Sequence, residues 1–137
     1  MFPASSAYVT SVGGTDLTGD STGAETAWTR SGGGFSDTFA MPAYQQAAVA
    51  AYKASADADL PDAAKWNATG RGFPDVAALG GKKNPYCTYG GGEWGGEAGT
   101  SASTPVVGAV FALLNGLRRT PRLGPRALDQ QICQSVC

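Results

Sequence analysis

The sequence predicts a three-layer α/β fold with a largely parallel sheet, and two observations lead to this class. Segments with strand-like composition, at residues 7–12 and 75–79, alternate with helix-like segments at 43–54 and 103–117. Such alternation is typical of helices packed on the faces of a parallel sheet. The length, 137 residues, suits one compact domain. Few strands are visible, so we expect a partial sheet with at least one edge that another segment covers.

The first strand, residues 7–12, is rich in β-forming residues and is expected to close in a turn at Gly13-Gly14. A short strand at 25–28 precedes a loop with the sequence Ser-Gly-Gly-Gly-Phe-Ser, residues 31–36. Adjacent glycines permit positive φ and a close approach to the backbone, which suits a bound ligand or a peptide chain. A flexible surface loop explains the same residues.

A helix is predicted over residues 43–54, opened by Pro42. An apolar stripe at helical spacing is expected to pack in the core; it comprises Tyr44, Ala47, Ala48, Ala51 and Tyr52. The polar segment 55–66 carries Asp57, Asp59 and Asp62. It lacks the glycine and terminal glutamate of a calcium loop, so it is interpreted as a solvated loop.

The second half begins with a predicted buried strand at 75–79. Residues 80–96, rich in glycine and aromatic residues, are expected to form a hairpin or a loop lining a cleft. A helix follows at 103–117, with Ser103 as its N-cap and an apolar face at Val106, Val107, Val110, Phe111 and Leu114. Residues 118–137 lack an apolar period and are expected to be a poorly ordered tail.

Composition excludes several classes of function. The net charge is −1 without a basic stripe, which argues against nucleic acid and anionic membranes as partners. No uninterrupted apolar run reaches the length of a membrane span, and no signal peptide is evident. The three cysteines, Cys87, Cys133 and Cys137, lack metal-site spacing and are interpreted as unpaired thiols. Histidine is absent, so the chain alone cannot build a Ser-His-Asp triad.

Ser101 is the candidate nucleophile. It lies between a glycine-rich segment and a predicted helix, in residues 99–105, Gly-Thr-Ser-Ala-Ser-Thr-Pro. A helix N-terminus directs free N–H groups and partial positive charge at the site where an oxyanion would develop. A serine also needs a base to become nucleophilic. The alternative for one serine at this position is a plain helix cap.

The heptad at 99–105, followed by Val-Val-Gly-Ala, resembles the nucleophile segment of the subtilisin-like clan of serine peptidases, and within it the sedolisin family. Residues 2–15, 31–36 and 67–78 are similar to further sedolisin segments, in the same order and spacing. Phe39, Pro42, Tyr44 and Gln45 match as well. The resemblance extends from residue 2 to about residue 117, and the detail around Asn67 and Ser101 is closest to the tripeptidyl-peptidase I group.

The resemblance implies that Ser101 is the nucleophile and that its backbone N–H is an oxyanion donor, within a nucleophile loop of Gly99, Thr100 and Ser101. It also implies that Ser31 and Gly32–Gly34 line the substrate cleft. In sedolisins a glutamate replaces the histidine, an aspartate supports it, and a second, protonated aspartate completes the oxyanion hole, which makes the enzymes active at acid pH. All three acids precede the segment matched here. Asp75, Glu93 and Glu97 are disfavoured as substitutes.

The resemblance further implies that residues 1–117 are the C-terminal half of a peptidase catalytic domain. Calcium is expected for the complete family domain, but its ligands follow the nucleophile helix, so no cofactor or metal is expected in this chain. The expected partners are a peptide or unfolded protein substrate, the remainder of the catalytic domain and a pro-segment. The expected location is lysosomal, vacuolar or extracellular, with Asn67 in a glycosylation sequon. The alternatives are an inactive truncated remnant or pseudoenzyme, and a binding module rich in glycine and aromatic residues.

Overall fold

The computed structural model describes residues 2–19, 23–55 and 60–119. Strands and helices are short, apart from one long helix near the end of the described region. The strands are β1 (Val12–Leu17), β2 (Glu25–Ala27), β3 (Gly34–Ala40), β4 (Gly70–Phe73), β5 (Val76–Leu79), β6 (Tyr86–Gly90) and β7 (Glu93–Glu97), and the helices are α1 (Gln46–Ala54) and α2 (Thr100–Arg119). Short 3₁₀ turns, η1 (Ala43–Gln45) and η2 (Ala63–Lys65), precede α1 and β4.

The central sheet has the order β2-β1-β5, with β1 and β5 parallel and in register from Val12↔Val76 to Thr15↔Leu79. The expected α/β class is therefore confirmed, with a sheet that is partly parallel where a largely parallel one was predicted. Within this three-stranded sheet β1–β2 is antiparallel, so one of its two strand pairs is parallel; β3–β4 and β6–β7 form two separate antiparallel sheets among the described residues. Among the described strands, the long connection from β1 to β5 provides the crossover that a parallel pair needs, whereas β6 and β7 are joined by a tight turn.

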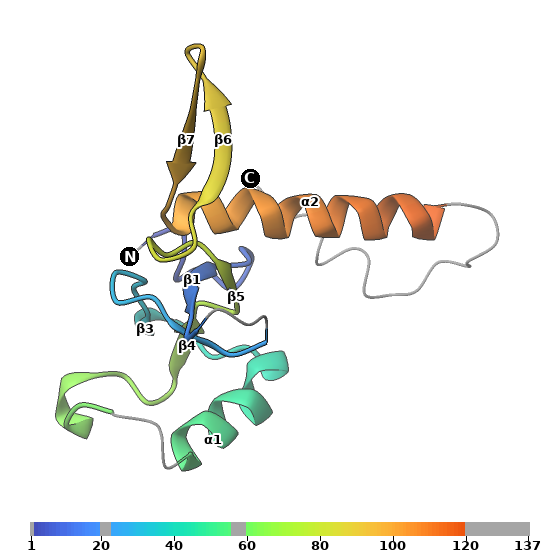
Figure 1. The fold of residues 1–137 in the computed structure, drawn as a ribbon. Helices are drawn as coiled ribbons and strands as arrows, with labels where there is room; N and C mark the ends of the chain where they lie inside the picture. The colour runs from blue at the N-terminus through green and yellow to red at the C-terminus, as the bar shows by residue number, and fades with distance from the viewer. Residues whose placement is uncertain (1, 20–22, 56–59, 120–137) are drawn as a thin grey trace.

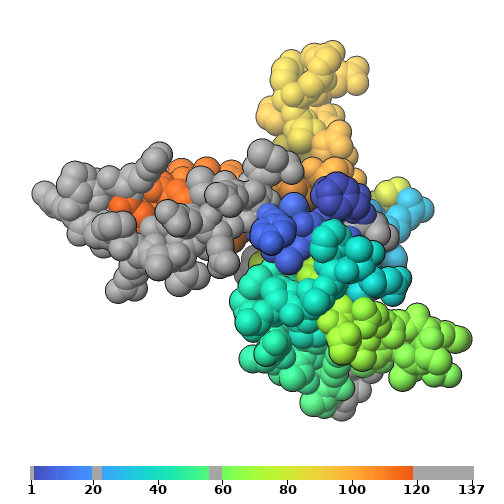
Figure 2. Space-filling view, turned by 180° about the vertical axis from the view of Figure 1, so that it is seen from behind, coloured from blue at the N-terminus to red at the C-terminus, as the bar shows by residue number. Residues whose placement is uncertain are grey.

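Figure 1 shows how the elements surround this sheet. Helix α2 lies along one side of β1 and β5, and β3, β4 and α1 lie on the opposite side. The β6–β7 hairpin projects from the rest of the molecule, which is also clear from behind in Figure 2. It turns through Gly91 and Gly92, whose φ angles are 63° and 90°. The predicted hairpin is confirmed, and all the residues of β7 are exposed.

The first strand lies later in the chain than predicted. β1 begins at Val12 and continues through Gly13 and Gly14 instead of ending there in a turn. A Cβ atom on Gly13 would lie 2.9 Å from Pro74, and one on Gly14 would lie 3.3 Å from Trp28. These glycines therefore allow close packing within a strand, although a pair of glycines in a sequence also indicates a turn.

The predicted helix at 43–54 is confirmed as η1 followed by α1. Its stripe is not in a core, because Tyr44 and Tyr52 are 58% and 51% exposed. They line an open cavity of about 450 Å³ together with Phe35 and Phe73 from β3 and β4. Within residues 2–19, 23–55 and 60–119, no element covers this face fully, so the prediction of core packing is wrong here.

The same holds for the other apolar segments. β5 is a strand as predicted, but Val76 is 37% exposed, so it is not buried. On α2, the side chains of Val110, Leu113 and Leu117 are 50%, 71% and 61% exposed. Among the residues that the structure describes, no hydrophobic side chain is buried.

Buried side chains in the described regions are polar, and Arg71 on β4 is the largest of them. It is fully buried and forms an ion pair with Asp75, with 2.6 Å between Nη2 and Oδ2. It also donates to the carbonyl oxygens of Gly72 and Val9, at 2.6 and 2.8 Å, while its Nε has no hydrogen-bond partner among the described residues. A buried cation needs such compensation, so this network fixes β4 against the segment that precedes β1.

Asp75 extends the network to other elements. Its carboxylate accepts hydrogen bonds from the Ser11 backbone N–H and from the Gln45 side-chain Nε2, each at 2.7 Å. Tyr44 lies beside it, and the pKa of the Tyr44 hydroxyl is raised above its usual value. Partial burial is the main cause and the negative charge of Asp75 is the second, while the positive charge of Arg71 lowers this pKa. Tyr44 therefore stays protonated at acid and neutral pH.

Helix α2 begins at Thr100, three residues earlier than predicted. Ser103 is not its N-cap: the Ser103 hydroxyl is fully buried in the first turn and donates toward the Gly99 and Thr100 carbonyls. By length and composition alone, α2 is apolar enough to cross a membrane, although the sequence contains no uninterrupted apolar run of that length. A core helix of a soluble domain meets the same criterion. The predicted tail, apart from Arg118 and Arg119 in α2, lies outside the described residues, as do Asp57, Asp59, Cys133 and Cys137.

Candidate active site

The structure places Ser101 in the first turn of α2 with its side chain exposed. The preceding Gly99 has φ 155°, a conformation that other residues rarely adopt. A Cβ atom on Gly99 would also lie 2.9 Å from Ser101 Oγ. Glycine at this position therefore permits the turn and leaves the hydroxyl uncrowded.

The nucleophile loop, residues 99–101, is fastened to the sheet through Gly80. The Gly99 N–H donates to the Gly80 carbonyl at 2.6 Å, and the Gly80 N–H donates to the Thr15 carbonyl at 3.1 Å. A Cβ on Gly80 would lie 2.7 Å from Ser103 Oγ and 2.8 Å from the Gly99 oxygen. The loop thus lies directly against the backbone at the end of β5.

The start of α2 presents unpaired backbone donors. The N–H groups of Ala102 and Ser103 donate to the Gly99 carbonyl at 2.9 and 3.2 Å. Those of Thr100 and Ser101 form no hydrogen bond within the described part of the chain. Together with the helix dipole, they provide a positive potential beside Ser101 Oγ, which suits a developing oxyanion.

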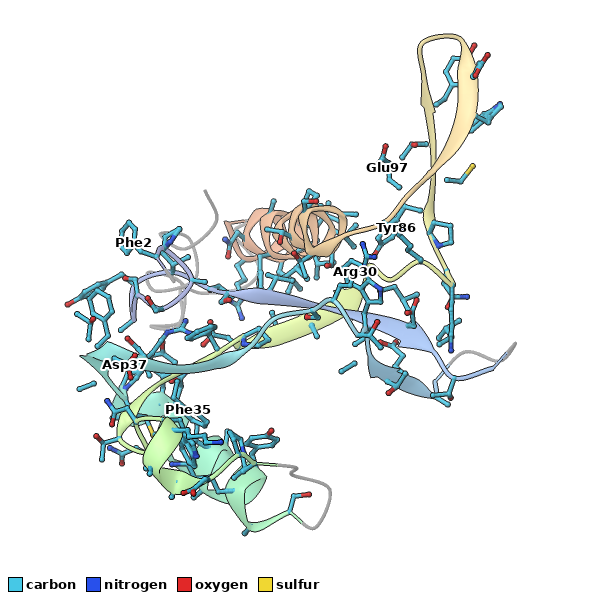
Figure 3. All side chains as sticks on the ribbon, turned by 90° about the vertical axis from the view of Figure 1, so that its left-hand side faces the viewer. Phe2, Arg30, Phe35, Asp37, Tyr86 and Glu97 are labelled. Carbon is cyan, nitrogen blue, oxygen red and sulfur yellow. The ribbon has the colours of Figure 1, made fainter. Side chains whose placement is uncertain are left out.

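Within the described residues, no base contacts Ser101. Its hydroxyl forms no hydrogen bond there, and the Asp75 carboxylate is occupied by Arg71 and Gln45. Glu97 is the last residue of β7 and is exposed at the base of the hairpin, shortly before α2 begins at Thr100 (Figure 3). The described residues also contain no group of three His, Cys, Asp or Glu side chains able to hold a metal ion.

The predicted cleft residues divide between two places. Ser31 accepts the Gly14 N–H at 2.9 Å, and Gly14 in turn lies close to Thr100, where a Cβ would be 3.6 Å from Thr100 Cγ2. Gly33 packs on Phe73, and Gly34 begins β3 and lines the cavity beside α1. Gly32 is exposed with open space around it. Ser31 is therefore near the nucleophile loop, across β1, whereas Gly34 belongs to the opposite layer.

Asn67 is half-buried and holds a local turn. Its Nδ2 donates to the Ser36 carbonyl at 3.0 Å, and its Oδ1 accepts from both the N–H and the hydroxyl of Thr69, at 3.1 and 2.8 Å. The sequon is therefore at the surface of the β3–β4 layer, in an Asx-type turn.

Sequence reasoning missed Gly80 and Gly81 as part of the site. They were assigned only to a glycine-rich loop or hairpin, yet they connect β1 to the nucleophile loop. A glycine pair directly after a predicted buried strand is the pattern that indicates such a close backbone approach.

Comparison with known proteins agrees with this geometry. The model of the subtilase family matches residues 1–136, so the chain belongs to the subtilase family of serine peptidases. Curated relatives identify the branch more closely. The chain is 44% identical to bovine tripeptidyl-peptidase 1 over 127 residues, covering 90% of this chain and 22% of the relative. It is 44% identical to human tripeptidyl-peptidase 1 over 144 residues, covering 94% and 24%. It is 51% identical to physarolisin of Physarum polycephalum over 87 residues, covering 64% and 14%. The chain therefore spans about a quarter or less of the length of these relatives.

Proposed function

We propose that this chain carries the nucleophile of a serine-type peptidase resembling the tripeptidyl-peptidases, which hydrolyses peptide bonds at acid pH. One observation supports this most strongly: Ser101 is exposed after a glycine at φ 155°, with unpaired N–H groups at its own position and at Thr100. A plain N-cap serine would instead accept the N–H of the second or third residue after it, whereas the Ser103 N–H donates to the Gly99 carbonyl and no hydrogen bond to Ser101 Oγ forms among the described residues.

In the proposed reaction, Ser101 Oγ attacks the carbonyl carbon of the scissile peptide bond. Its proton passes to a carboxylate base and then to the leaving amine, while the C–N bond breaks and an ester forms on Ser101. The N–H groups at residues 100–101 stabilise the oxyanion. Water then hydrolyses the ester and restores the hydroxyl.

The base is proposed to be a glutamate supported by an aspartate, with a protonated aspartate completing the oxyanion hole, all from parts of the catalytic domain that this chain does not hold. Two observations support this division: the Ser101 hydroxyl forms no hydrogen bond within the described part of the chain, and Asp75 is engaged by Arg71 and Gln45. The requirement for a protonated aspartate gives the acid pH. Calcium and the pro-segment are likewise proposed for the complete domain.

We also propose that the described region is the C-terminal half of a three-layer catalytic domain, with α2 inside it and not in a membrane. The exposed apolar face of α2 and the unpaired edge of β5 support this, because the remainder of such a domain would cover both. The proposed location is lysosomal, vacuolar or extracellular, with Asn67 glycosylated.

The test compares the 137-residue chain with the full-length product of the same gene, at about pH 4, on an unfolded protein and on peptides with a free N-terminus. We expect hydrolysis only by the full-length product, abolished by Ser101→Ala and retained by Thr88→Ala, which removes another exposed hydroxyl. Hydrolysis by the full-length Ser101→Ala variant would refute the role of Ser101. No hydrolysis by either wild-type protein would favour the pseudoenzyme.

A further inference from the structure

Asp16 is a buried acid that the proposed reaction does not use. It lies on β1, its side chain is 6% exposed, and its Oδ1 accepts the Lys83 N–H at 3.0 Å. A carboxylate held away from water is costly unless hydrogen bonds or an opposite charge compensate it. Its surroundings therefore indicate what it supports.

Asp16 lies directly against Gly81. A Cβ atom on Gly81 would overlap the Asp16 carboxylate, so a larger residue at position 81 would have to displace that side chain. The Gly81 N–H donates to the carbonyl of Thr15, the residue before Asp16, at 3.0 Å. The Asn84 side chain also accepts the Leu17 N–H at 3.0 Å. The turn at 80–84 is thus clamped onto the end of β1 on both sides of Asp16.

This turn is also what holds the nucleophile loop. Gly80 accepts the Gly99 N–H at 2.6 Å, and Gly99 lies two residues before Ser101. A shift of the turn would therefore move Gly99 and, through the start of α2, the Ser101 hydroxyl and the N–H groups beside it. Displacements of about 1 Å at such groups lower catalytic rates by about 100-fold.

We propose that Asp16 and Gly81 form a clamp that positions the nucleophile, so that Asp16 is a positioning residue for the reaction at Ser101. This inference rests on the proposed function for its catalytic consequence, but the structural coupling from Asp16 to Gly99 is independent of it.

The test uses single and double variants of the full-length gene product. Gly81→Ala forces a methyl group into the Asp16 carboxylate and is expected to lower kcat by about 100-fold, with a smaller change in KM. Asp16→Ala removes one hydrogen bond and is expected to lower kcat by about tenfold. The Asp16→Ala/Gly81→Ala variant relieves the overlap, so it should be at least tenfold more active than the product of the single effects predicts. Asp16→Asn keeps an acceptor for the Lys83 N–H and should restore most of the activity lost in Asp16→Ala.

Gly19→Ala is the matched control, because Gly19 has open space around it in the same part of the chain. Titration of active sites with an irreversible serine reagent separates positioning from folding. The clamp predicts that kcat falls per titrated site. Fewer titrated sites with an unchanged kcat per site would overturn it. The clamp would also be overturned if the activity loss of the double variant equals the product of the losses of the two single variants.

Hydrogen exchange of the same variants tests the coupling without any catalysis. Asp16→Ala should accelerate exchange in a peptide covering 98–103 and leave one covering 34–40 unchanged. Unchanged exchange at 98–103 would overturn the clamp even if Ser101 is the nucleophile. Hydrolysis that survives Ser101→Ala would instead refute the proposed function. In that case the exchange at 98–103 would still test the coupling between Asp16 and Gly99.

Discussion

At the scale of single residues, glycines near Ser101 have distinct tasks. Gly99 adopts φ 155° and keeps the Ser101 hydroxyl clear, whereas Gly80 allows Ser103 and the Gly99 carbonyl to lie against the sheet. Both tasks depend on the absence of a side chain, but only the first is evident from a glycine next to a serine. The second depends on contacts between Gly80 and residues 99 and 103, which are distant from it in sequence.

Gly99→Ala tests the first task. We expect the full-length product to lose about 100-fold in the rate of Ser101 acylation, because the new methyl group crowds Oγ and the backbone conformation becomes strained. The rate of labelling by a serine-directed reagent measures this. Gly95→Ala, at a strand position with open space around it, should label at the wild-type rate. Equal labelling of both variants would contradict the assigned role of Gly99.

At the scale of elements, the first turn of α2 is a packing unit. Ser103 is fully buried and lies against Gly14 and Gly80, from β1 and the end of β5. Small residues on both sides let the helix approach the sheet closely, and this approach sets the height of Ser101 above the strands.

Ser103→Leu should therefore destabilise the full-length product by about 1–3 kcal/mol through overpacking, whereas Ser103→Ala should cost about 1 kcal/mol. Thermal unfolding followed by circular dichroism measures the difference. Thr104→Leu is the adjacent control, since Thr104 is exposed. If Ser103→Leu is no less stable than Thr104→Leu, the packing described for this turn is wrong.

Elements with strong local patterns were predictable from sequence, as the helix at 43–54, the hairpin and the parallel strand β5 show. The predicted boundaries of elements were wrong where a residue type is common in two different structural settings. Gly13 and Gly14 indicate a turn by composition but sit inside β1, and Ser103 indicates a cap but is packed inside the helix. Strand β3 was missed because its first residue, Gly34, is the last of three glycines. The motif at Ser101 could be located, but the clamp at Asp16 depends on contacts that no local pattern contains.

At the scale of the whole molecule, the pattern of exposure is the central feature. The described residues bury Arg71, Asp16 and several other polar side chains, yet no hydrophobic one. The apolar faces predicted from helical spacing exist, but the described chain covers them only in part: Val107 and Phe111 on α2 are half-buried, whereas Val110 is 50% exposed. Burial follows from the complete set of neighbours, which one segment's sequence does not contain.

The isolated 137-residue chain should consequently bind a fluorescent apolar dye and self-associate, since exposed apolar surface favours burial. Val110→Asp should reduce both effects in the isolated chain while it destabilises the full-length product. Dye fluorescence and sedimentation velocity measure these outcomes. A monodisperse isolated chain without dye binding would contradict the claim that other parts of a domain cover α2.

The central claim, that Ser101 is a peptidase nucleophile, is tested most directly by locating the covalent adduct of a serine-directed fluorophosphonate. After reaction of the full-length product at acid pH, mass spectrometry of its peptides identifies the modified residue. We predict one adduct, on Ser101, that forms only in the folded protein and is absent from Ser101→Ala. An adduct on another serine, with Ser101 unmodified in an enzyme that hydrolyses peptides, would contradict it.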